Sequence, residues 1–172
     1  MQAGPCGALS PIPAVKRNAK ERVMANSPII LLVEDYPHDA LFVMRSFRHA
    51  GVPNKLQVVE SAEAAMQYLS ASGPYADRTK HPLPGILIVD VRLPGLSGLD
   101  LLKWLQARPE LALMPVVIMA GAEKQDDVRQ ALQLGAAAYL IKGQDMDVLV
   151  QMVLNARLDW TNEMLHDHPH AA

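Results

Sequence analysis

Five short runs of apolar, mostly β-branched residues recur along the chain, and a segment with helical spacing of apolar residues follows each of them. The runs are residues 29–33, 56–59, 86–89, 115–119 and 137–141. Such runs are typical of strands buried on both faces, and strands that alternate with helices form parallel βαβ units. The alternation predicts an α/β domain with helices on both faces of one sheet. In the first helix, the stripe expected to face the sheet is Leu41, Met44, Phe47 and Ala50.

Composition limits the class of protein. The 172 residues include 16 Lys and Arg against 18 Asp and Glu, so no basic excess argues for nucleic acid as a partner. The single cysteine, Cys6, leaves no disulfide framework and fits a reducing cytoplasm. No apolar stretch is long enough to cross a membrane. We therefore expect a cytoplasmic protein whose partners include neither nucleic acid nor a membrane.

The chain is expected to divide into three parts. Residues 1–27 are rich in proline and glycine near their start and predict a flexible segment. An alternative is that translation begins at Met24. Residues 28–158 hold the alternating pattern and form the expected domain, and residues 159–172 are expected to be a C-terminal extension. Within the domain, residues 70–85 form a polar loop longer than a usual connection, which indicates an insertion.

Charged residues stand where three of the apolar runs end. Glu34 and Asp35 follow the first run, Asp90 follows the third, and Lys142 follows the fifth. In open parallel sheets the ligand crevice lies beyond the carboxyl ends of the strands, so these side chains are expected to meet there. Three carboxylates in one crevice repel each other, and a hard divalent cation such as Mg²⁺ removes that repulsion.

These residues also suggest a reaction. Carboxylates, Mg²⁺ and an ammonium that suits a phosphoryl oxygen indicate phosphoryl transfer onto Asp90. The alternative is an ion-pair network at the sheet edge without chemistry. A small phosphatase with Asp90 as nucleophile is less favoured, because Arg92 stands where a second carboxylate would protonate the leaving group.

Residues 29–153 resemble the receiver domain of two-component response regulators. The segments that carry the resemblance are LLVED, IVDVRLPGLSG, PVVIMAG and GAAAYLIK, in that order and in the expected strand context. The resemblance implies a flavodoxin-like (βα)5 three-layer sandwich with a parallel sheet of strand order 2-1-3-4-5. It also implies a phosphoacceptor signalling protein that catalyses only its own phosphotransfer and dephosphorylation, rather than an enzyme with a separate substrate.

The resemblance further implies roles for single residues, carried over by position. Asp90 is expected to accept a phosphoryl group from a sensor histidine kinase, and Lys142 to pair with the phosphoryl oxygens. Glu34, Asp35 and Asp90 are the expected Mg²⁺ ligands, together with the backbone carbonyl of Arg92. We expect no other cofactor.

The expected conformational switch departs from the family pattern. Ala120 stands where the family has a Thr or Ser whose hydroxyl donates to the phosphoryl group, and such a bond to a charged group is worth roughly 1.5–3 kcal/mol. Tyr139 falls at the aromatic position whose ring turns with phosphorylation state. The alternative, equally favoured by the sequence, is an ordinary strand aromatic that packs on the core. The main alternative function is therefore a phosphorylation-independent interaction module that has kept the fold and lost the switch.

Within the family, the sequence most resembles single-domain regulators paired with phytochrome kinases, through VEDYPHDALF, the 70–85 insertion and a Trp-containing extension. Members of this subgroup form dimers through the final helix and the segment after it. The final helix carries more apolar surface than packing on one sheet face requires, which supports a homodimer; the alternative is a tail folded onto its own domain. The expected interface residues are Val148, Met152, Trp160, Met164 and Leu165.

Overall fold

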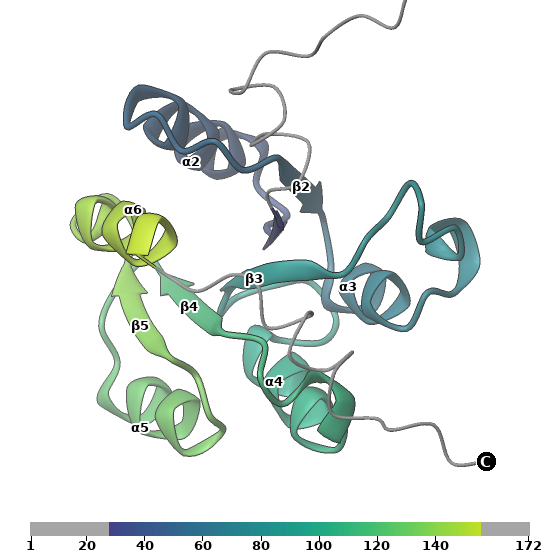
Figure 1. Ribbon diagram of the computed structural model, residues 1–172. Helices are drawn as coiled ribbons and strands as arrows, with labels where there is room; N and C mark the ends of the chain where they lie inside the picture. The colour runs from purple at the N-terminus through teal and green to yellow at the C-terminus, as the bar shows by residue number, and fades with distance from the viewer. Residues whose placement is uncertain (1–27, 156–172) are drawn as a thin grey trace, which may run out of the picture.

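The computed structural model describes residues 28–155, and strands and helices alternate along them as the sequence predicts (Figure 1). The strands are β1 Ile29–Val33, β2 Leu56–Val59, β3 Pro84–Asp90, β4 Val116–Ala120 and β5 Ala138–Ile141. The helices are α2 Pro37–His49, α3 Ala62–Leu69, α4 Gly98–Gln106, α5 Gln125–Gln133 and α6 Met146–Asn155, with 3₁₀ turns at Gly73–Tyr75 and Pro109–Leu111. The predicted segments 1–27 and 159–172, and with them Trp160, Met164 and Leu165, lie outside the described residues.

The five strands form one parallel sheet in the order β2-β1-β3-β4-β5. Helices α2 and α6 pack on one face, and α3, α4 and α5 pack on the other (Figure 1). The predicted flavodoxin-like three-layer sandwich and its strand order are therefore confirmed. Among the described residues, no helix combines the length and the apolar character needed to span a membrane.

Helices on both faces explain why the central strands carry no polar alternation. In β1, Leu31 and Val33 pack with α3 and α4, whereas Ile30 and Leu32 pack with α2 and α6. Every residue of β1, β3 and β4 is buried. Burial of both faces requires apolar side chains at successive positions, which is the pattern of the sequence runs.

Helix α2 faces the sheet with a different stripe from the predicted one. It buries Ala40, Val43 and Phe47, whereas Leu41 and Met44 are 39% and 37% exposed. The predicted stripe was right for Phe47 and wrong for Leu41 and Met44. Residues 40–44 are all apolar, so spacing alone does not fix how the helix is turned about its axis. The result is a helix that carries large apolar side chains on its outer surface.

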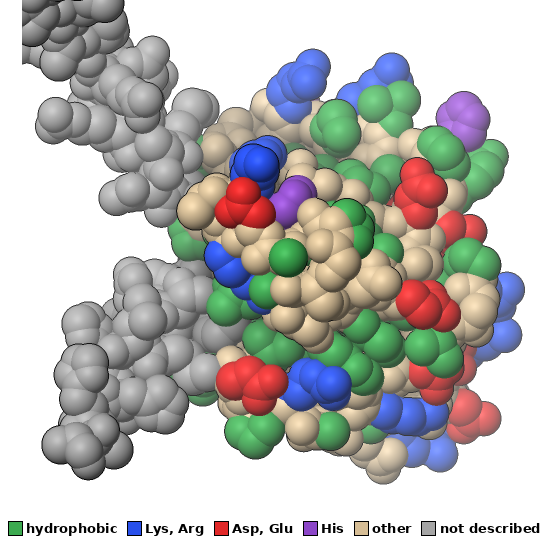
Figure 2. Space-filling view, turned by 90° about the vertical axis from the view of Figure 1, so that its right-hand side faces the viewer, with side chains coloured by type: hydrophobic (Ala, Val, Ile, Leu, Met, Phe, Trp, Pro, Cys, Tyr) green, Lys and Arg blue, Asp and Glu red, His purple; other side chains and the backbone are tan. Residues whose placement is uncertain are grey.

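The predicted insertion packs against the C-terminal end of α3. The guanidinium of Arg78 donates to the carbonyl oxygens of Tyr68 and Leu69, which lie in the last turn of α3, where carbonyls have no partner within the helix. The hydroxyl of Tyr68 donates to the carbonyl of Pro82 at 3.1 Å, and β3 takes up the last two residues of the segment. Figure 2 shows the molecule from its α3 side, where acidic and basic side chains are scattered rather than gathered into a patch of one sign.

Candidate phosphoacceptor site

Three carboxylates meet at the carboxyl ends of two neighbouring strands. Glu34 and Asp35 follow β1, and Asp90 is the last residue of β3, which pairs directly with β1. One carboxylate oxygen from each residue lies within 4.8 Å of the other two. Glu34 and Asp90 are buried, and Asp35 is exposed. The structure thus brings together the three carboxylates that the sequence predicts as metal ligands.

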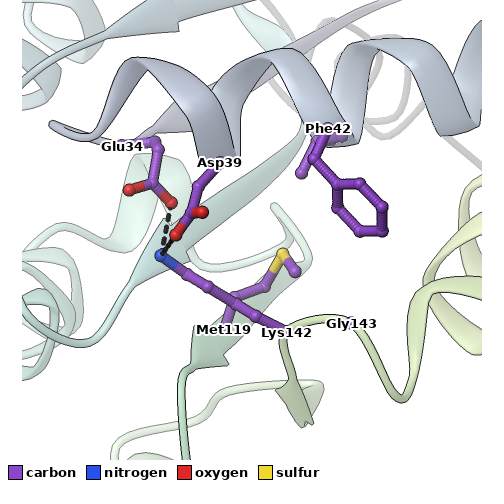
Figure 3. A pocket seen from close by; sticks show the side chains of 7 residues that line it. Glu34, Asp39, Phe42, Met119, Lys142 and Gly143 are labelled. Atoms are coloured by element: carbon purple, nitrogen blue, oxygen red, sulfur yellow. Dashed lines mark hydrogen bonds and ion pairs between the residues drawn. The ribbon is translucent and has the colours of Figure 1, made fainter.

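Lys142, which follows β5, reaches two of these carboxylates. Its Nζ donates to Glu34 Oε2 at 2.7 Å and to Asp90 Oδ2 at 2.8 Å. A third carboxylate, Asp39 Oδ2, accepts from the same nitrogen at 2.8 Å (Figure 3). The structure therefore joins the three predicted groups of charge and adds one acid that the sequence reasoning missed.

Asp39 reaches the site because α2 begins there. Pro37 occupies the first turn of α2, and Asp39 is the acidic residue of that turn. An acid in a first helical turn is favoured by the helix dipole. The signal that points to Asp39 is therefore its place in a turn that starts two residues after Asp35, at the edge of the sheet where the strands end.

Burial and charge oppose each other at this cluster. Burial alone would lower the pKa of Lys142, but the hydrogen bonds from its ammonium to Asp39, Asp90 and Glu34 outweigh burial and raise that pKa. The pKa of Glu34 is raised by burial, and the ammonium of Lys142 offsets only part of that effect. The Lys142 side chain is therefore a fixed cation that holds two buried acids.

Backbone groups fix the acceptor carboxylate and the loop after it. The N–H of Arg92 donates to Asp90 Oδ1 at 3.1 Å, opposite the oxygen that Lys142 binds. Gly98 begins α4 so close to β3 that a Cβ atom on it would lie 2.3 Å from the carbonyl oxygen of Asp90. The N–H of Gly98 donates to the carbonyl of Val91, which closes the loop. The predicted metal ligation by the Arg92 carbonyl stays a prediction.

The two predicted switch positions flank this cluster. Ala120 is the buried last residue of β4, and it offers no hydroxyl at the site. Tyr139 on β5 is half-buried, and its hydroxyl donates to the carbonyl of Ala122 at 3.4 Å. Burial and the nearby carboxylate of Asp127 raise the pKa of Tyr139, and the charge of Arg92 lowers it. The hydroxyl of Tyr139 thus contacts the loop that follows Ala120.

A pocket of about 270 Å³ opens beside Lys142, between α2 and the end of β5 (Figure 3). Its lining residues are Glu34, Asp39, Phe42, Val43, Met119, Lys142 and Gly143. On α6, away from this pocket, two predicted dimer residues differ in exposure: Val148 is 49% exposed, and Met152 is half-buried. Their place in an interface stays a prediction.

Comparison with known proteins gives consistent matches over most of the chain. The family model of the response regulator receiver domain matches residues 30–154. Response regulator Rcp1 of Synechocystis sp. is 29% identical over 137 residues, which are 79% of this chain and 91% of Rcp1. The crystal structure of its Mn²⁺-bound form is 27% identical with a TM-score of 0.63, over 85% of this chain and 100% of that chain. The phosphorylated cyanobacterial phytochrome response regulator RcpA is 25% identical with a TM-score of 0.64, over 84% of this chain and 99% of that chain.

Proposed function

Since the chain belongs to the response regulator receiver family, we propose that it accepts a phosphoryl group on Asp90 from a sensor histidine kinase. The observation that carries the proposal is the environment of Asp90. One of its carboxylate oxygens accepts from the Lys142 ammonium, the other accepts from the Arg92 N–H, and two further carboxylates lie beside it. A carboxylate held in this way is oriented for nucleophilic attack.

In the proposed reaction a carboxylate oxygen of Asp90 attacks the phosphorus of a phosphohistidine. A P–O bond forms, the P–N bond breaks, and the imidazole leaves with the electron pair and takes a proton from water. Lys142 donates to an oxygen of the transferred group, which matches the role of a point charge in phosphoryl transfer. Glu34 keeps the ammonium oriented through their 2.7 Å contact.

The same acids fit a divalent cation. Glu34, Asp35 and Asp90 offer hard oxygen donors, the ligands that Mg²⁺ prefers, within 4.8 Å of one another. When bound, Mg²⁺ would neutralise charge that develops on the transferred phosphoryl group. The Mn²⁺-bound form of Rcp1 supports a divalent cation in a relative of this chain.

The relatives also support a type of kinase. RcpA is a phytochrome response regulator, and we propose a phytochrome as the kinase that phosphorylates this chain in the cytoplasm. The signal would then pass through protein contacts, with the exposed side of α6 around Val148 as the surface of a homodimer.

One observation favours a second function. Ala120 is buried at the end of β4 and has no hydroxyl to donate to a phosphoryl group. This favours an interaction module that works without phosphorylation. The ion pairs among Lys142, Glu34 and Asp90 weigh against it, because such a module does not require them.

The deciding experiment is incubation of the full chain with Mg²⁺ and acetyl phosphate, with intact mass as the readout. We expect a gain of one phosphoryl group in the wild type and none in Asp90→Asn. A folded wild type that gains nothing from acetyl phosphate or from a phosphorylated histidine kinase would overturn the proposal in favour of the interaction module. Labelling of Asp90→Asn to the same extent would overturn the assignment of the acceptor.

A further inference from the structure

Asp39 contributes a fourth carboxylate to the site, from α2 rather than from a strand. Its Oδ2 lies 2.8 Å from Lys142 Nζ, the same distance as Asp90 Oδ2 (Figure 3). The side chain of Asp39 is 39% exposed, whereas those of Glu34 and Asp90 are 2% and 9% exposed. Of the three acids that bind Lys142, Asp39 is therefore the one that water reaches.

Lys142 does not need Asp39 to keep its position. An ammonium has three N–H donors, and the three carboxylates take all of them. Glu34 and Asp90 are buried and stand at the ends of two paired central strands, so they direct the ammonium by themselves. Asp39 therefore contributes its negative charge, and it accepts one of the three N–H groups of the Lys142 ammonium.

That charge acts on cations and anions in opposite directions. Asp39 and Asp90 accept from the same nitrogen, so a phosphoryl group that arrives at Asp90 meets the negative charge of Asp39 nearby. Asp39 also neutralises part of the positive charge of Lys142 that would attract that group. A divalent cation bound by the same cluster is held more tightly for both reasons, because it is attracted by the charge of Asp39 and repelled less by the partly neutralised Lys142.

Accordingly, and on the premise of the proposed function, we propose that Asp39 binds the Lys142 ammonium in the unphosphorylated protein and thereby restrains phosphorylation of Asp90. The phosphoryl oxygens compete with Asp39 for Lys142. When the Lys142 N–H leaves Asp39, the Asp39 carboxylate is rehydrated at little cost, because it is half-exposed. Glu34 is enclosed and keeps its bond.

The test is Asp39→Asn, which keeps the shape of the side chain and removes its charge. We expect phosphorylation by acetyl phosphate at saturating Mg²⁺ to become faster, by roughly threefold to tenfold for a unit charge at this range near the surface. We expect the affinity of the unphosphorylated protein for Mg²⁺, measured by calorimetric titration, to fall by a similar factor. Asp39→Glu retains the charge and is expected to stay near the wild type in both measurements.

The opposite directions of the two changes separate this role from a structural one, because a disturbed site would lose both phosphorylation rate and metal affinity. The matched control is Asp126→Asn, which removes an exposed first-turn acid from α5 and should change neither quantity. If circular dichroism shows that Asp39→Asn is unfolded, Asp39→Ser replaces it, since serine is favoured near helix N-termini.

An unchanged or slower phosphorylation rate in folded Asp39→Asn, beside a wild type that is phosphorylated, would overturn this inference alone. Metal affinity that is unchanged or higher in this variant would also overturn it. A wild type that accepts no phosphoryl group would overturn the proposed function, and this inference would fall with it.

Discussion

The peptide N–H of Lys142 donates to the carbonyl oxygen of Ala120 at 2.8 Å, so the last residue of β4 and the lysine after β5 are joined directly at the site. The lysine that binds Asp90 and the position that lacks a hydroxyl thus share one backbone hydrogen bond. Gly121 follows Ala120, and apart from Gly121 and its two chain neighbours no atom of the described residues lies within 4 Å of the place where its Cβ would stand. The loop after β4 is therefore open on the side where a Gly121 Cβ would point.

A hydroxyl at position 120 should strengthen the response of this loop. In Ala120→Thr we expect phosphorylation to slow amide hydrogen exchange in residues 121–124 more than it does in the wild type, because the added donor binds the phosphoryl group. A bond of that kind is worth roughly 1.5–3 kcal/mol. The measurement is hydrogen exchange by mass spectrometry with and without phosphodonor. Ala120→Val is the matched control, since valine has the shape of threonine without the hydroxyl; an equal response in both variants would rule out the hydroxyl as the cause.

Close packing at Gly98 gives a second prediction. Gly98→Ala would drive a methyl group to 2.3 Å from the Asp90 carbonyl oxygen, so the backbone at the end of β3 must shift. We expect the free energy of unfolding to fall by about 1–3 kcal/mol, the usual cost of overpacking, and phosphorylation of Asp90 to slow. Gly121→Ala provides the comparison, because its methyl group would lie more than 4 Å from every described residue except its chain neighbours. Denaturant unfolding of both variants checks the prediction, and equal losses of stability would contradict it.

The strands and most of the site were predictable from the sequence for a local reason. Buried parallel strands are short apolar runs, and the residue that follows each run lies at the carboxyl edge of the sheet, as Glu34 and Lys142 do. The family resemblance then predicted the order of the strands. That order puts β1, which precedes Asp35, beside β3, which ends at Asp90.

The rest depended on contacts between segments far apart in the chain. Asp39 and Lys142 are 103 positions apart, and their contact requires both the start of α2 and the end of β5 in three dimensions. The orientation of α2 was missed for a similar reason, since the sheet buries Ala40 and Val43 although Leu41 and Met44 are larger apolar residues. Periodicity reports which positions share a face, but only packing decides which face is buried.

Tyr68 gives the protein a predictable response to alkaline pH. Burial raises the pKa of its hydroxyl from 10.0 to about 12, although the charge of Arg78 acts in the other direction. Because the pKa is higher in the folded state, this stabilisation is complete below pH 10.0 and is lost as the pH rises through about 12. We expect the free energy of unfolding to fall by on the order of 2 kcal/mol across this range, and to fall less in Tyr68→Phe. Denaturant unfolding at several pH values tests this, and equal slopes for the two proteins would refute it.

The exposed apolar surface of α6 leads to a prediction about assembly. Val148 is 49% exposed on this helix, and a buried charge at a dimer interface is strongly unfavourable. If α6 forms the proposed homodimer, Val148→Glu should shift the mass measured by light scattering from two chains to one. Leu132→Glu is the matched control, because Leu132 is 53% exposed on α5, across the sheet from α6, and should leave the dimer intact. A wild type that stays monomeric at concentrations of about 100 μM would contradict the proposed dimer, since stable interfaces of standard size hold far below that concentration.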